Sequence, residues 1–408
     1  MSPLEHSSSL ETALRWLDQQ SDTMLKLLIQ LCDQNSGTFN ATGVSQVADI
    51  LQQQYQGLGD HCERQATPPA CLLNDLGQEE SFPLGPNLLV EARPNLARRF
   101  FLCIHMDTVF DEQHPFQKCR ISEPGILNGP GVIDAKGGQV VMLYALRAFE
   151  MTMAAKNVGW RVFMNPDEEI GSLGSTPRLL ELARDCELGL LFEPVLPDGS
   201  MVAARKGSGN FTIVCRGQSA HSGRDFHAGR NAVVHLAKVL IAIDQLNSEP
   251  SDVTYNVGRV QGGGPVNMVP DLAVARLNIR AQDPQACDEA VAAVQTIIDQ
   301  HGANPDYQLQ LDGVFSSPPK VVDSGTVKIQ QVIQRCASSL QLPLSWRDTG
   351  GASDGNKLSG IGIPNVDTLG PVGNHLHSSK EFLVTESLVQ RAKLAAAVLH
   401  DLAVSQPL

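Results

Sequence analysis

The chain has 408 residues, 42% of them hydrophobic and 18% charged, which is enough for two or three domains of a globular protein. Its formal net charge of −13 argues against a nucleic-acid groove and against binding to an anionic membrane surface. No apolar run approaches the roughly 18 residues that span a bilayer, and the first residues do not resemble a secretory signal. The nine scattered cysteines include no C-x-x-C motif, so we expect reduced thiols and a cytoplasmic protein.

The first two hundred residues alternate between predicted helices and strands. Leucines at helical spacing predict a helix or helix pair over 9–34, and a second helix follows over 44–58. Residues 60–85 are expected to be irregular. Apolar runs predict strand structure at 87–91, 100–104, 132–133, 160–164 and 188–192. With helices between them, these strands predict an α/β fold, with a mainly parallel sheet covered on both faces.

The pattern changes at Lys206. From there to about residue 315 the order is strand, helix, strand, strand, helix, strand, which is typical of a ferredoxin-like α+β unit. The α/β pattern then resumes, with a helix over 326–340, a glycine-rich loop over 349–355, a strand over 365–369 and a last helix over 385–403. We predict a catalytic domain in two parts, residues 1–205 and 317–408, with residues 206–316 inserted as a second domain.

Side chains that can bind metals follow the predicted strands. They are His105 and Asp107, Asp134, Glu168 and Glu169, and Glu193, with His377 far downstream. Because parallel strands end at one edge of a sheet, we expect these groups to converge there. Imidazole and carboxylate together suit zinc, and also cobalt or manganese. The pattern predicts a two-metal hydrolase centre with metals roughly 3.5–4 Å apart, and Asp134 is the candidate bridging ligand.

Each of these signals also has an ordinary explanation. A histidine after a strand is usually a loop residue, a Glu-Glu pair is usually solvated, and a Gly-Pro-Gly loop is usually a turn. The segment GPGVIDAKGG lacks the spacing of both common phosphate-binding loops, which disfavours a phosphate site. Only the joint occurrence of the signals, in this order, favours a metal centre.

A family resemblance emerges from the ordered motifs HMDTV, GPGVIDAKGG, PDEEIGSLGS, FEP, GQSAHSG, GGGPVNMVPD and GNHLHSSKE. Together they resemble the dizinc exopeptidases, a family that includes glutamate carboxypeptidase (carboxypeptidase G), aminoacylase, succinyl-diaminopimelate desuccinylase and tripeptide aminopeptidase. The motifs span residues 36–381, and NSGTFNATGV and RKGSGNF are most similar to the glutamate carboxypeptidase branch. The resemblance implies two zinc ions, or cobalt or manganese in their place.

The resemblance also implies which residues bind the ions. His105 and Glu193 would bind one metal, Glu169 and His377 would bind the other, and Asp134 would bridge them. Glu193 stands where many members have aspartate, which is a normal variant in the family.

Two further residues next to the ligands have implied roles. Asp107 would hold the His105 ring through its other nitrogen. Glu168 would be the general base, passing a proton from the activated water to the leaving amine. His375 is the rival of His377, and we prefer His377 because Glu381 follows it by four residues, as in the family.

The inserted domain would be a dimerisation domain and substrate lid. The resemblance implies that His221 reaches the partner subunit's active site and stabilises the oxyanion, although an exposed turn histidine is the plain alternative. Asn267 and Arg280 match positions that hold the substrate's free carboxylate. Lys206 and Ser208 are further candidates for the same pocket, and Arg280 could instead be a surface cation.

These observations lead to one hypothesis and its competitors. We expect a homodimeric dizinc hydrolase that cleaves the amide bond of an N-acyl amino acid or a small peptide with a free carboxylate. An aminoacylase or a desuccinylase of a diamino acid is the alternative among enzymes. A metal-free relative that serves as a binding or scaffold protein is the alternative of another class, and the complete ligand set argues against it.

Overall fold

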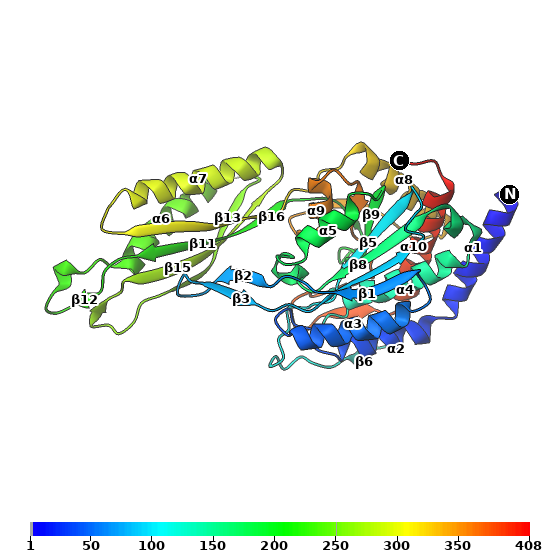
Figure 1. Cartoon of the computed structure of the whole chain (residues 1–408), viewed down its shortest axis with the longest axis horizontal. Coiled ribbons are helices and arrows are strands. Elements are labelled where there is room, and N and C mark those ends of the chain that lie inside the picture. Colours follow the sequence, from blue (N-terminus) through cyan, green and yellow to red (C-terminus); the bar gives the residue numbers. More distant parts are fainter. Residues whose placement is uncertain (1–2, 250) are drawn as a thin grey trace.

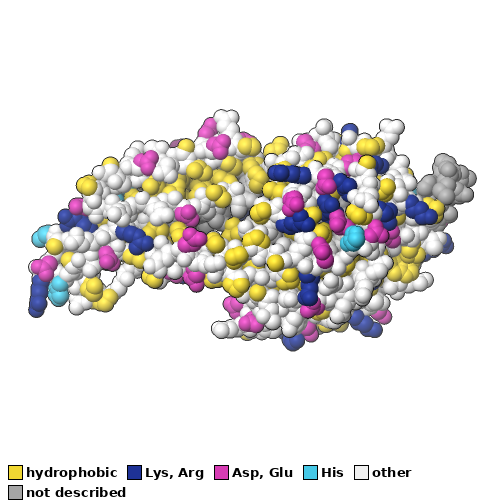
Figure 2. Space-filling view, in the orientation of Figure 1, with side chains coloured by type: hydrophobic (Ala, Val, Ile, Leu, Met, Phe, Trp, Pro, Cys, Tyr) yellow, Lys and Arg dark blue, Asp and Glu magenta, His cyan; other side chains and the backbone are white. Residues whose placement is uncertain are grey.

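The computed structural model describes residues 3–249 and 251–408 and has two lobes joined end to end (Figure 1). Figure 2 shows the same face in space-filling form, with hydrophobic side chains gathered where the two lobes meet. Within the described residues, no helix combines the length and the apolar character that crossing a membrane requires.

The first lobe is built on a six-stranded sheet covered by helices. The strand order is β1 (His61–Gln65), β4 (Asn87–Ala92), β8 (Gly159–Asn165), β5 (Arg99–His105), β9 (Leu188–Leu191) and β18 (Asn365–Val366). Strands β8, β5, β9 and β18 run parallel, whereas β1 and β4 add antiparallel pairs at one edge. The α/β fold with a mainly parallel sheet is therefore confirmed.

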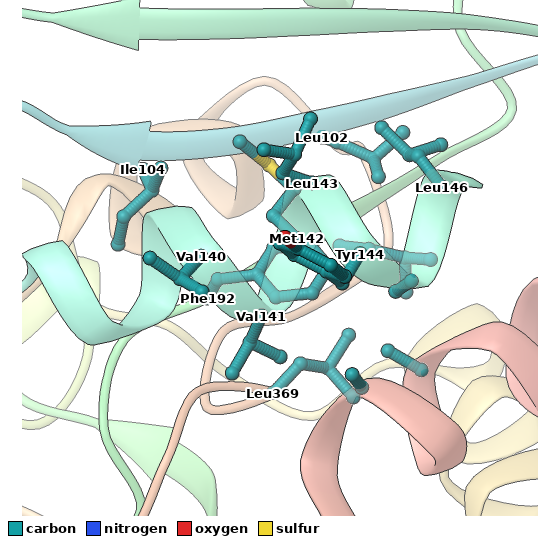
Figure 3. Close-up of a cluster of buried hydrophobic side chains, with 14 of the residues drawn as sticks. Leu102, Ile104, Val140, Val141, Met142, Leu143, Tyr144, Leu146, Phe192 and Leu369 are labelled. Atoms are coloured by element: carbon teal, nitrogen blue, oxygen red, sulfur yellow. The ribbon is translucent and has the colours of Figure 1, made fainter. Parts of the chain in front are cut away.

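Helices cover both faces of this sheet. They are α1 (Pro3–Asp18), α2 (Ser21–Cys32), α3 (Ala41–Tyr55), α4 (Lys136–Glu150), α5 (Thr176–Ala183), α8 (Ser324–Ser339), α9 (Asp354–Gly360) and α10 (Glu386–Val404). Strand β5 shows why both faces need covering, because its side chains are apolar on both sides. Leu102 and Ile104 pack into the core that contains α4 and α10. Phe101 and Cys103 pack into a second core with α5 and α9. A strand buried on both faces reads as a continuous apolar run. In Figure 3, β5 side chains lie against the apolar side chains of α4.

Smaller sheets extend the first lobe. One has the order β19 (Gly373–Asn374), β20 (Phe382–Val384), β7 (Ile126–Asn128) and β6 (Arg120–Glu123), and β10 (Met201–Arg205) pairs in parallel with β17 (Trp346–Thr349). A hairpin of β2 (Ala70–Leu73) and β3 (Glu79–Phe82) reaches from this lobe toward the other (Figure 1). Short 3-10 helices are η1 (Met153–Asn157), η2 (Glu168–Ile170), η3 (Phe226–Ala228) and η4 (Gln245–Asn247).

The second lobe is an antiparallel sheet with two helices. Its elements are β11 (Gly207–Arg216), α6 (Ala232–Asp244), β13 (Thr254–Gly262), β15 (Leu272–Ala281), α7 (Pro284–Gly302) and β16 (Gln308–Ser317), with strand order β13-β15-β11-β16. A ribbon of β12 (Ala220–His221) and β14 (Met268–Val269) extends from it. The side chains of Phe211, Ile213 and Leu277 form a separate core with α6 and α7. The predicted order of strands and helices in this segment matches the structure, while its behaviour as a separate domain stays a prediction.

Two local predictions were wrong, and a third differs only at its ends. Residues 60–85 contain β1 and the β2–β3 hairpin, whereas the loop predicted over 349–355 is present between the end of β17 at Thr349 and the start of α9 at Asp354. Val132 and Ile133 belong to a turn before α4, because their burial comes from packing rather than from a strand ladder. The predicted strand end at Asp134 is therefore a turn.

Candidate active site

The three central parallel strands deliver acidic and imidazole groups to one edge of the sheet. His105 is the last residue of β5, η2 with Glu168 and Glu169 follows β8, and Glu193 follows β9. Because β8, β5 and β9 are parallel neighbours, their carboxyl ends lie side by side, which is where open α/β sheets place their sites. The predicted convergence of these residues agrees with this arrangement.

Asp134 reaches the same place from a turn rather than a strand. The turn is held by Glu381, whose carboxylate accepts hydrogen bonds from the backbone N–H groups of Gly131 (3.0 Å), Ile133 (2.9 Å) and Asp134 (3.2 Å). Gly131 has a φ of 71°, a left-handed conformation that glycine adopts without strain. Glu381 thus fixes the position of Asp134 although it lies far away in sequence.

Asp134 stands between two groups of potential metal ligands. One group is His105, Asp134 and Glu193, and the other is Asp134, Glu169 and His377, with the ligand atoms of each group within 4.8 Å of one another. Asp134 Oδ1 lies 3.1 Å from His105 Nε2, and Asp134 Oδ2 lies 3.1 Å from His377 Nε2. Each carboxylate oxygen of one aspartate therefore faces a different group.

A hydrogen-bond network orients the first group. His105 Nδ1 lies 3.0 Å from the Asp107 carbonyl oxygen and 3.2 Å from Asp107 Oδ1, which leaves Nε2 directed at Asp134. Asp107 also accepts hydrogen bonds from Thr38 Oγ1 (2.7 Å) and from the backbone N–H groups of Glu168 (3.1 Å) and Glu169 (3.2 Å). A carboxylate that fixes the imidazole tautomer is common beside metal ligands. Asp107 therefore ties the end of β5 to η2.

The chemistry of the donor set fits two divalent cations. Burial raises the pKa of Glu193, and burial together with the charge of Asp134 raises that of Glu169. Glu169 Oε1 is buried and has no hydrogen-bond partner among the described residues. Imidazole nitrogens and carboxylate oxygens are ligands that zinc, cobalt and manganese accept. Cations would satisfy the orphaned oxygen and the crowded negative charge.

Glu168 lies beside the ligand groups but belongs to neither. Its side chain forms no hydrogen bond to another residue in the described ranges, unlike that of Glu169, whose Oε2 lies 3.2 Å from His377 Nε2. Burial raises the pKa of Glu168 well above its ordinary value, and the charge of Glu193 adds to this effect. Such a carboxyl group is suited to accept a proton.

The loop after β19 places His377, rather than His375, near the other groups. His377 Nε2 faces Asp134 and Glu169, whereas the His375 ring packs against Phe382 with centroids 5.9 Å apart. Both histidines have left-handed backbones, with φ of 59° for His377 and 62° for His375, which is uncommon outside glycine. This placement favours the predicted choice of His377.

Arg280 and Ser208 lie opposite each other on β15 and β11 of the second lobe. Arg280 donates to the Gly350 carbonyl and, over 3.1 Å, to Asn278 Oδ1, and no acidic partner is found among the described residues. Burial lowers the pKa of Arg280. Lys206 is already engaged, since its ammonium donates to the Asp252 carbonyl over 2.5 Å. Arg280 therefore has the capacity to bind a carboxylate, whereas Lys206 would first have to release Asp252.

His221 and Asn267 lie elsewhere in a single chain. His221 is in β12, at the end of the second lobe farthest from β5 and β8 (Figure 1). The Asn267 carbonyl accepts a hydrogen bond from Ser222 N (2.9 Å), which places it on the same tip. Both residues are exposed, and the structure does not bring them to the metal-ligand groups of their own chain.

Several supporting residues were not predicted from the sequence. Gln139 of α4 donates to the His105 carbonyl over 2.6 Å. Behind η2, buried Asp354 accepts hydrogen bonds from Asn165 (2.8 Å) and Ser172 (2.5 Å) and forms an ion pair with Lys357 (2.9 Å). In a sequence, Asn, Ser and Asp residues usually indicate a helix cap or a turn. Their contacts with residues far away in the chain therefore could not be predicted.

Comparisons with known proteins identify relatives of this chain. A profile described as "Peptidase family M20/M25/M40" matches residues 101–401. The chain is 23% identical over 391 residues to carboxypeptidase G2 of Pseudomonas sp. (strain RS-16), covering 94% of this chain and 90% of that protein. It is 25% identical over 292 residues to succinyl-diaminopimelate desuccinylase of Stutzerimonas stutzeri (strain A1501), covering 68% and 74%. The M20 family metallo-carboxypeptidase Sso-CP2 of Sulfolobus solfataricus has a similar structure, with a TM-score of 0.73, 16% identity and coverage of 94% and 99%.

Proposed function

This chain belongs to peptidase family M20/M25/M40, a family of metal-dependent hydrolases of peptides or acyl amino acids, and we propose that it acts as a carboxypeptidase-type enzyme. Its substrate is an N-acyl amino acid or small peptide with a free carboxylate beside the cleaved amide bond. The observation that carries the proposal is the pair of ligand groups that share Asp134 at the carboxyl ends of β5, β8 and β9.

The ligand groups define how the ions would be held. His105, Asp134 and Glu193 would hold one ion, and Asp134, Glu169 and His377 the other, with zinc as the proposed metal and cobalt or manganese as substitutes. When bound, divalent ions of this kind act as Lewis acids and make water a stronger nucleophile at neutral pH. The Asp107 contact keeps the His105 ring in the tautomer that leaves Nε2 free.

Glu168 is the proposed general base. Its half-buried carboxylate takes a proton from the attacking water and gives it to the leaving amide nitrogen, so that the amine departs neutral. Its backbone N–H is fixed by Asp107, which keeps its side chain next to the ligand groups without making it a ligand. Proton transfer of this type contributes roughly 10²–10⁴-fold to the rate.

The second lobe supplies the proposed substrate contacts. Arg280, which has no acidic partner among the described residues, binds the free carboxylate, with Ser208 beside it and Lys206 as a further contact. A guanidinium suits this task because it can donate two parallel hydrogen bonds. Binding of the carboxylate thereby positions the substrate's amide bond at the metal-ligand groups.

We propose a homodimer because His221 and Asn267 are remote from the ligand groups of their own chain. Residues 206–316 form the dimerisation and lid domain between catalytic parts 1–205 and 317–408. His221 of one subunit stabilises the oxyanion in the active site of its partner, and Asn267 joins the carboxylate contacts there. The cytoplasm is the proposed location, as the cysteine pattern predicted.

The competing functions have less support. Aminoacylase and desuccinylase activities are special cases of the same amide hydrolysis, and no observation favours either of them here. A metal-free binding or scaffold role would not require five residues grouped as potential metal ligands with the carboxyl group of Glu168 beside them.

Chelation tests the proposal. Purified protein is depleted of metal, and hydrolysis of N-acetyl amino acids and dipeptides is measured before and after zinc, cobalt or manganese is added. We expect activity only after metal addition and only on substrates with a free carboxylate. Full activity in the depleted protein would refute the proposal, as would equal activity on the corresponding amides.

A further inference from the structure

A cavity of about 720 Å³ lies between the β2–β3 hairpin and the sheet of the second lobe. Leu72 and Leu73 line it from the hairpin, Ile170 and Leu173 from the segment around η2, and Asn278 from β15. Its size is within the range of small-molecule pockets. It opens where the two lobes meet, the region in which Figure 2 shows hydrophobic side chains on the surface.

The cavity borders both parts of the proposed site. Ile170 directly follows the ligand-group residue Glu169, and Asn278 accepts the hydrogen bond from Arg280 Nε (3.1 Å). Because side chains alternate along a strand, Asn278 and Arg280 lie on the same face of β15. The cavity therefore extends away from the gap between the ligand groups and Arg280.

The covalent structure of the proposed substrate indicates which of its groups would enter this cavity. In an amino acid residue, the amide nitrogen, the carboxylate and the side chain all leave from one carbon atom. When the carboxylate is on Arg280 and the amide bond is at the ligand groups, that carbon lies between them. The cavity with Ile170 and Asn278 in its lining borders both places and offers that side chain a space to occupy.

The charges in the cavity do not suit an acidic side chain. Arg276 is the cation in the lining, and its guanidinium already binds Leu73 O (2.6 Å) and Thr212 Oγ1 (2.6 Å) and lies 3.5 Å from Asp75 Oδ1. The lining also contains the carboxylate of Asp312. An incoming carboxylate would therefore find no free cation and would lose its hydration.

The hairpin wall of the cavity is anchored to the second lobe. Asp75 forms an ion pair with Arg259 (2.5 Å), and Arg216 donates to the carbonyl oxygens of Leu76 and Gly77, each over 3.2 Å. These contacts join the hairpin tip to β13 and β11, so the hairpin and the sheet of the second lobe face each other across the cavity.

We propose that this cavity receives the side chain of the residue that carries the free carboxylate, and that the enzyme selects apolar residues such as leucine or phenylalanine over glutamate there. The inference rests on the proposed function and adds the substrate class. Small differences in apolar contact change kcat/KM by about 10-fold or more, so we expect at least that preference.

The test uses the zinc-loaded enzyme and three substrates with one acyl group, N-acetylleucine, N-acetylphenylalanine and N-acetylglutamate. Leucine and phenylalanine should exceed glutamate by about 10-fold or more in kcat/KM. A glutamate substrate that equals or exceeds leucine would overturn the inference and leave the proposed function standing. Metal-independent hydrolysis, or none of any substrate, would overturn both.

Variants of Leu173, which is 37% exposed at the cavity, locate the selectivity. Leu173→Arg should raise the glutamate-to-leucine ratio of kcat/KM, and Leu173→Ser should lower kcat/KM for leucine without helping glutamate. Val327→Arg on α8 is the matched control, since Val327 is 39% exposed and does not line the cavity, and it should leave the ratio unchanged. An unchanged ratio in both Leu173 variants would refute the assignment of the cavity.

Discussion

Replacing Asp367 with alanine should destabilise the fold by about 3–5 kcal/mol, because it leaves two buried cations without their counter-ion. Asp367 lies where the chain crosses between the lobes, and there Arg205 and Lys320 exchange backbone hydrogen bonds of 3.1 and 3.0 Å. Both of their side chains turn to the same carboxylate.

The magnitude follows from the contacts. Asp367 Oδ2 lies 2.7 Å from Arg205 Nε and 2.9 Å from Lys320 Nζ, and Asp367 Oδ1 lies 3.2 Å from Arg205 Nη2. Ser353 Oγ adds a hydrogen bond of 3.1 Å, and all four side chains are buried. Removing one member of a buried ionic cluster lowers the free energy of unfolding by more than the cluster's net contribution, because the remaining charges stay buried without a counter-ion.

Urea denaturation of the purified variants provides the measurement, with a shift of the midpoint at unchanged slope reporting stability. Asp49→Ala is the control, because its ion pair with Arg64 is 39–47% exposed and should contribute at most about 1 kcal/mol. Adding Lys320→Met to Asp367→Ala should recover part of the loss. A loss below about 1 kcal/mol in Asp367→Ala would refute the reasoning.

The pH dependence has a defined sign. Burial alone would raise the pKa of Asp367, but Arg205 and Lys320 outweigh it, so the pKa lies well below its ordinary value. A carboxyl group whose pKa is lower in the folded state than in the unfolded state stabilises the fold. This contribution is complete above the unfolded pKa of about 3.9, and it is lost as the pH falls below that value toward the folded pKa. The difference between the wild type and Asp367→Ala should therefore shrink in acid.

The remaining predictions concern catalysis. Glu168→Gln should keep both metals and lose roughly 10²–10⁴-fold in kcat, whereas Glu169→Gln should lose metal, and the opposite pattern in elemental analysis would exchange their roles. Arg280→Ala should cost about 1.5–3 kcal/mol in binding substrates with a free carboxylate and little for matched amides, so equal losses would show that Arg280 is not the carboxylate contact. Mixing inactive His221→Ala and Glu168→Gln proteins should restore activity after subunit exchange, and verified exchange without activity would contradict action across the dimer.

Much of the site could be predicted because local sequence carries it. The central strand over 99–105 is apolar on both faces and then becomes polar, and the same change occurs after β8 and β9. A buried parallel strand requires the apolar run, and the polar residues at its carboxyl end lie at the edge of the sheet where sites form. The grouping of His105, Glu169 and Glu193 could therefore be predicted without a structure, while their role as metal ligands stays a prediction.

Other parts depend on distant contacts that leave little local trace. Asp134 is positioned by Glu381, so its approach through a turn was misread as a strand end. The hairpin at 70–82 is short and largely exposed, and its tip is anchored by arginines of the second lobe, including Arg216 and Arg259. Thr38 donates to Asp107 from a loop whose sequence alone indicates only a turn.

The central claim is a dinuclear centre that shares Asp134, and zinc titration of metal-depleted protein tests it most directly. Activity and bound zinc are measured in the same samples, with Glu193→Ala and Asp134→Ala as variants. The account predicts that wild-type activity reaches its plateau at two zinc ions per chain, that Glu193→Ala binds one ion tightly, and that Asp134→Ala binds neither tightly. A plateau with no zinc or with a single ion, or two tightly bound ions in Asp134→Ala, would contradict it.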